Sequence, residues 1–126
     1  MYKQRVIGLL LLGLLTILLG ACGGGGASTT TNPTIKLDAA SFLQDSITIK
    51  KGESLTFINE TTSPHVIANG TWEDGAAQPG AESGAPPVNV NIPAHGSATT
   101  PPFGTAGTFK LYCPIHPNMN LTVMVE

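Results

Sequence analysis

The sequence predicts an all-β domain, an antiparallel sandwich or barrel of about seven or eight short strands. Apolar and polar residues alternate along several segments, which is typical of strands with one buried face. Glycine-containing turn pairs separate these segments about every ten residues. No stretch after residue 33 keeps helical spacing for long enough to predict a helix. The 126 residues, of which 41% are hydrophobic and 11% charged, support one ordinary domain.

The N-terminus has the features of an export signal, which we assign to residues 1–21. Lys3 and Arg5 precede an uncharged run over residues 6–19, which is shorter than the roughly 20 residues that a membrane-spanning helix needs. Residues 19–22 read Leu-Gly-Ala-Cys and resemble the bacterial lipobox. That resemblance implies that Cys22 is lipidated and becomes the first residue of the mature chain. An ordinary signal with an incidental cysteine is the alternative.

Residues 22–33 are rich in glycine, serine and threonine, a composition typical of a flexible spacer. We therefore expect an exported protein with a lipid anchor at Cys22, a spacer and one folded domain over residues 34–126. The anchor would hold the domain on the extracytoplasmic face of a bacterial cell membrane. An acylated Cys22 cannot pair with Cys113, so the mature protein would carry an unpaired thiol in an oxidising compartment. Such a thiol requires a specific role.

Composition excludes several classes of function. The net charge of −2 and the absence of a basic cluster argue against nucleic-acid binding. Three histidines and two cysteines leave little material for catalysis or for a disulfide framework. Nothing in the sequence favours a stable oligomer, so we expect a monomer.

The predicted strands are separated by turns at regular intervals. Each contains an alternation of apolar and polar residues, and pairs containing glycine, such as those at 51–52, 69–70, 95–96 and 106–107, lie between them. The alternating segments are residues 47–49, 55–57, 88–92, 109–111 and 121–125.

The segment 71–87 stands apart because it contains repeated glycines and prolines. We predict a long loop here, of a length that is often functional or mobile. Trp72, at its start, is expected to pack against one end of the sandwich.

A cluster of metal-ligating side chains lies late in the chain. Cys113, His116 and Met119 fall on a predicted loop between strands at 107–112 and 121–125. His65 follows a Ser-Pro pair and opens another predicted strand. One cysteine, two histidines and one methionine form the ligand set of a mononuclear blue-copper centre, in which the methionine is a weak axial ligand.

Two other residues are alternative ligands. His95 lies in a predicted turn, where a solvated loop residue is the simpler interpretation. Met124 alternates with Val123 and Val125 and so faces the opposite side of its strand, which favours Met119 as the axial ligand.

These motifs resemble the cupredoxins, small copper proteins of the plastocyanin, amicyanin and azurin kind, over residues 34–126. The Cys-x2-His-x2-Met spacing with proline after the histidine is similar to the ligand loop of amicyanin. The resemblance implies a Greek-key sandwich that binds one type 1 copper ion. It implies that Cys113 is the equatorial thiolate, His65 and His116 are the equatorial imidazoles, and Met119 is the axial thioether.

The resemblance also implies a function. Electrons would pass through His116 at an apolar patch formed by Pro114, Ile115, His116 and Pro117, where redox partner proteins dock briefly. We therefore expect a one-electron carrier and not an enzyme. Copper handling or delivery without a main role in electron transfer is the alternative, and a metal-free structural domain is a further one.

The sequence departs from the family pattern at one position. Val66 stands where the family usually has an asparagine that braces the ligand loop. Valine cannot supply that hydrogen bond, and contacts around metal ligands tune the site, so we predict no reduction potential.

Overall fold

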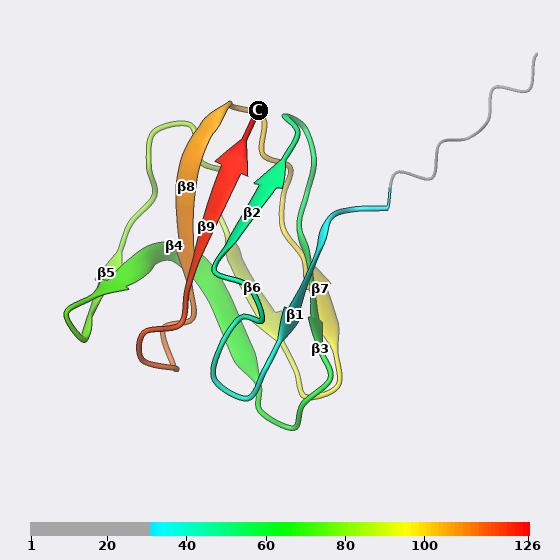
Figure 1. Cartoon of the computed structure of the whole chain (residues 1–126), viewed down its shortest axis with the longest axis vertical. Coiled ribbons are helices and arrows are strands. Elements are labelled where there is room, and N and C mark those ends of the chain that lie inside the picture. The colour runs from blue at the N-terminus through cyan, green and yellow to red at the C-terminus, as the bar shows by residue number, and fades with distance from the viewer. Residues whose placement is uncertain (1–30) are drawn as a thin grey trace, which may run out of the picture.

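The computed structural model describes residues 31–126, which form nine strands in two sheets (Figure 1). The predicted export signal, the Cys22 lipidation site and most of the predicted spacer lie outside the described residues. The strands are β1 (Thr34–Leu37), β2 (Ser46–Ile49), β3 (Thr56–Asn59), β4 (His65–Glu73), β5 (Ala76–Pro79), β6 (Asn89–Ile92), β7 (Ser97–Thr99), β8 (Gly107–Tyr112) and β9 (Asn120–Val125).

The all-β prediction is confirmed, and the strand pairing is mixed rather than purely antiparallel. One sheet has the order β1-β3-β7, and the other has the order β2-β9-β8-β4-β5 with β6 also paired to β4. The pairs β1–β3 and β2–β9 are parallel, whereas β8 and β9 form an antiparallel pair with six residue partners. Within residues 31–126, no helical segment meets the length and hydropathy that a bilayer crossing requires.

The core lies between the two sheets and follows the predicted alternation. Apolar residues on the inner faces of the strands are buried, because period-two spacing places them all on one side. The largest fully buried side chains include Phe57, Phe103, Phe109, Ile35, Leu55, Ile67 and Leu111. This core fixes the strands whose ends carry the candidate site.

The predicted loop at 71–87 is wrong in its first part, which is a β-hairpin. β4 continues to Glu73 and pairs with β5 from Gly70↔Pro79 to Glu73↔Ala76. The two-residue turn is Asp74-Gly75, and both residues have positive φ (49° and 76°), as a type I′ turn requires. Asp-Gly is typical of a hairpin turn. However, all four residues of β5 are exposed, so the sequence after the turn has no alternation of apolar and polar residues that would predict a strand.

The hairpin lies tightly against the larger sheet. Gly70 has φ of 137°, and a Cβ atom at this position would come within 2.5 Å of the Gln78 carbonyl oxygen and 2.7 Å of the Tyr112 ring. Only glycine therefore allows β4 to approach Tyr112 this closely. This contact seats the β4–β5 hairpin beside the strand that leads into Cys113.

Candidate metal centre

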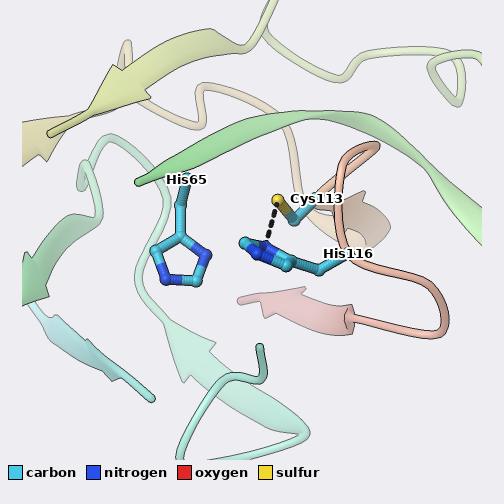
Figure 2. Close-up of side chains that lie close together, drawn as sticks. All are labelled: His65, Cys113 and His116. Atoms are coloured by element: carbon cyan, nitrogen blue, oxygen red, sulfur yellow. Dashed lines mark hydrogen bonds between the residues drawn. The ribbon is translucent and has the colours of Figure 1, made fainter. Parts of the chain in front are cut away.

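Two elements at one end of the sandwich position the candidate ligands. Cys113 and His116 lie on the ligand loop, residues 113–119, which joins the adjacent strands β8 and β9. His65 is the first residue of β4, where it pairs with Ile92 of β6. Figure 2 shows the three side chains converging from these two segments.

The side chains form a compact donor group. One ligand atom each from His65, Cys113 and His116 lies within 4.8 Å of the others. The Cys113 Sγ atom is 3.4 Å from His116 Nδ1, the contact drawn in Figure 2, and the two imidazole centroids are 4.7 Å apart. His116 therefore directs Nδ1 towards the thiol, while its Nε2 lies 3.4 Å from Ser63 Oγ.

The unpaired nitrogens of His65 show that this group suits a metal ion. His65 is 1% exposed, yet neither Nδ1 nor Nε2 makes a hydrogen bond. Buried polar atoms are almost always paired, and an orphaned one calls for an explanation such as an ion. A soft thiol, two imidazoles and a thioether are the donors that a type 1 copper ion uses. The residues therefore fit copper.

Met119 is buried at the base of the ligand loop. Its carbonyl oxygen accepts the Cys113 N–H at 3.0 Å, and its own N–H donates to the His116 carbonyl at 3.2 Å. The His116 N–H in turn donates to the Cys113 carbonyl at 3.3 Å. The three candidate ligands of this loop are thus fixed to one another by backbone hydrogen bonds.

The two alternative ligands lie elsewhere. His95 is exposed in the turn between β6 and β7, where its φ of 53° suits a turn, and it is not part of the donor group. Met124 is 39% exposed on the outer face of β9. Because His95 and Met124 both lie away from the donor group, their positions favour His65, Cys113, His116 and Met119 as the copper ligands.

The turn before His65 is held by Asn59, which the sequence analysis did not single out. Asn59 is 1% exposed, and its Nδ2 donates to the carbonyls of Ser63 (2.7 Å) and Pro93 (3.0 Å). Its Oδ1 accepts the N–H and the hydroxyl of Thr61 at 3.0 Å and 2.8 Å. Since Ser63 also faces His116, this network ties both parts of the site together.

Burial lowers the pKa of His65 below its ordinary value of 6.5, and the Coulombic effect of the neighbouring His116 lowers it further. The Asp38 backbone opposes this shift more weakly, although it does not reach hydrogen-bonding geometry with either ring nitrogen. His65 therefore favours the neutral form, which is the form that binds a metal.

This shift predicts how the stability of the metal-free protein depends on pH. Between the lowered pKa of folded His65 and 6.5, the unfolded chain binds more protons than the folded one. The free energy of unfolding should therefore decrease as the pH falls through 6.5 and level off below the folded pKa. Urea titrations between pH 7.5 and pH 5 measure this free energy of unfolding. In the variant His65→Gln, it should decrease less steeply as the pH falls. An equal slope in both proteins would contradict it.

The fold and the donor group define a class: small β-sandwich proteins that hold one metal ion between a strand and a single loop. A sequence profile of the copper-binding proteins of the plastocyanin/azurin family matches residues 30–126. The chain belongs to this family, whose cofactor is copper and whose members are blue copper electron carriers rather than enzymes.

Individual relatives agree with this membership. The chain is 33% identical over 87 residues to a plastocyanin from Scenedesmus fuscus, covering 66% of this chain and 86% of that protein. A plastocyanin from Ulva prolifera is 28% identical over 88 residues, covering 68% and 87%. The structure of amicyanin from Paracoccus versutus superposes with a TM-score of 0.58 at 21% identity, covering 77% of this chain and 83% of amicyanin, which shows the shared fold. Plastocyanin-like proteins are exported to the periplasm or a lumen.

Proposed function

We propose that the protein is a one-electron carrier that holds a single type 1 copper ion with His65, Cys113, His116 and Met119. The observation that carries this proposal is the donor group itself, in which a fully buried histidine with two unpaired ring nitrogens faces a thiol and a second imidazole. When bound, copper supplies the Cu(II)/Cu(I) couple. The buried thiol, imidazoles and thioether offer both soft sulfur and nitrogen donors, which suits both oxidation states.

The framework around these ligands supports electron transfer rather than catalysis. Cys113 and Met119 are buried, and His65 is excluded from water, so these side chains have little room to rearrange. Ligands that keep their positions in both oxidation states need little reorganisation when an electron arrives or leaves. The same enclosure leaves no access for a substrate to the buried donors.

The surface above His116 is the proposed exit for electrons. Ile115 is 54% exposed, Pro117 is exposed, and Pro114 and His116 are half-buried. Pro114, Ile115 and Pro117 form an apolar patch together with His116, whose Nδ1 faces the thiol of Cys113. A small apolar surface suits brief docking with redox partner proteins.

We also propose the organisation that the sequence suggests. Residues 1–21 are an export signal, residues 22–33 carry the lipid on Cys22 and a flexible spacer, and residues 34–126 are the copper domain. The lipid holds the domain on the extracytoplasmic face of the cell membrane as a monomer. The lipobox-like residues 19–22 and the start of β1 at Thr34 support these boundaries.

Spectroscopy of the copper-loaded protein tests the function. We expect a soluble form beginning at Ala27, given one equivalent of Cu(II), to show an intense blue absorption band and a narrow copper hyperfine splitting by electron paramagnetic resonance. Ascorbate should bleach the band, and an oxidant should restore it. A pale protein with ordinary tetragonal copper parameters would show that the thiol is not an equatorial ligand and would favour copper delivery instead.

A further inference from the structure

Trp72 lies outside the candidate ligand set, yet it is hydrogen-bonded to both ends of the ligand loop. Its indole Nε1–H donates to the Cys113 carbonyl at 3.0 Å. Its backbone N–H donates to Asn120 Oδ1 at 2.7 Å, and its backbone carbonyl accepts Asn120 Nδ2 at 3.0 Å. Cys113 is the first residue of the loop and Asn120 directly follows its last, so a single residue of the β4–β5 hairpin is hydrogen-bonded to both ends of the loop.

The Cys113 carbonyl is a junction within the loop. It accepts the Trp72 indole N–H and also the His116 backbone N–H at 3.3 Å, the hydrogen bond that forms the turn between these two candidate ligands. Cys113 is completely buried, so if the indole N–H is removed, water cannot reach the Cys113 carbonyl oxygen to replace that hydrogen bond. The orientation of this peptide group, and with it the turn, therefore depends on Trp72.

Packing within the β4–β5 hairpin and against β8 fixes the Trp72 indole in the position from which it donates to the Cys113 carbonyl. Trp72 packs edge-on against Tyr112, with ring centroids 6.3 Å apart and an interplanar angle of 71°. Gly70, two residues earlier, brings β4 into close contact with the same tyrosine ring. The position of the indole is thus set by packing as well as by its own hydrogen bonds.

We propose that Trp72 and Asn120 form a brace that positions the ligand loop, and that Trp72 is a positioning residue for the copper site. Val66, next to His65, has no side-chain group that can form such hydrogen bonds, whereas the brace reaches the loop from the opposite end of β4. This inference rests on the proposed copper function for its spectroscopic consequence. Its consequence for the loop itself holds without metal.

Amide hydrogen exchange of the full-length, metal-free protein tests the brace directly. The variant Trp72→Phe keeps an aromatic ring beside Tyr112 but removes the indole donor. We expect the His116 and Met119 amides, which close the turns of the loop, to exchange about tenfold faster, while amides of the β8–β9 ladder keep their rates. Tyr112→Phe is the matched control, because it also removes one polar group from an aromatic ring, while the indole N–H of Trp72 keeps its hydrogen bond to the Cys113 carbonyl.

Two results would overturn the inference. Exchange that rises equally at the loop and across the β8–β9 ladder would show that Trp72 serves only global stability. Loop rates in Trp72→Phe that match those in Tyr112→Phe would show that the indole donor does not hold the loop.

The copper-loaded full-length proteins give a second readout that a purely structural role would not move. Trp72→Phe and Asn120→Ala should each change the Cu(II) hyperfine splitting and the relative intensities of the visible bands, whereas Tyr112→Phe should reproduce the native spectrum. Unchanged spectra in both variants would also overturn the inference. A native protein without the blue band would refute the proposed function instead, and the exchange measurement would still decide on the brace.

Discussion

Replacing Cys113 by serine should abolish the intense blue absorption of the copper-loaded protein. The Sγ atom is the one thiol of the donor group and lies 3.4 Å from His116 Nδ1, so its loss removes the soft donor that distinguishes this site. Changes in residues that only support metal ligands cost about 10- to 100-fold in affinity, and we expect the loss of a ligand to cost at least about 100-fold for Cu(I). Competition with a Cu(I) chelator and visible spectroscopy measure the two effects.

Serine is a suitable replacement because it preserves the shape of the loop. The Cys113 backbone keeps its hydrogen bonds to Met119 and His116, and the side chain changes by a single atom. The variant His95→Gln provides the control, since it removes an exposed histidine outside the donor group and should keep the native spectrum and affinity. A serine variant that remains blue would refute the assignment of Cys113.

Replacing Asn59 by alanine should cause the largest loss of stability among polar substitutions near the site. The change removes four hydrogen bonds at a position that is 1% exposed and leaves the Thr61 N–H unpaired. The Pro93 carbonyl keeps the Gly96 N–H, and the Thr61 hydroxyl keeps only a long contact of 3.5 Å to the Ser63 carbonyl. Unpaired buried groups cost roughly 1–3 kcal/mol each, and partial access of water to the turn reduces the sum, so we expect a loss of about 3 kcal/mol. Urea unfolding of the metal-free protein measures it.

Two further variants identify the cause of that loss. Asn59→Asp keeps the acceptor for Thr61 but removes the donor to Ser63 and Pro93, and it should be about as unstable as Asn59→Ala. Asn91→Ala changes an exposed asparagine of β6 and should alter the free energy of unfolding by less than about 0.5 kcal/mol. A similar loss in Asn59→Ala and Asn91→Ala would show that the buried network is not stabilising.

The sequence predicted those parts of the fold that burial encodes locally. Strands such as β8 and β9 alternate inward apolar residues with outward polar ones, and the structure buries the expected set. β5 has four exposed residues, and β7 has three residues of which only Ala98 is partly buried, so the alternation in β7 is too short to predict a strand. Their existence depends on pairing with β4 and β3, which single-strand patterns do not reveal.

The same distinction applies to the site. Cys113, His116 and Met119 share one short loop, so their spacing was sufficient to group them. Trp72, which is hydrogen-bonded to both ends of this loop, is distant in sequence: it lies 41 positions from Cys113 and 48 from Asn120. A tryptophan near a turn and an asparagine at a strand start have no distinctive pattern, and only the folded chain shows what they bind.

The directions of β1 and β9 determine which end of the molecule is available for attachment. Thr34 lies opposite Thr56, whereas Leu37 lies opposite Asn59, at the end from which the chain turns towards His65. β9 starts beside the ligand loop and runs away from it, so the C-terminus lies at the end of the sandwich opposite the donor group, while the chain reaches β1 from the side (Figure 1). A fused domain or an electrode surface joined at Glu126 would therefore attach at the end of the sandwich away from His65, Cys113 and His116.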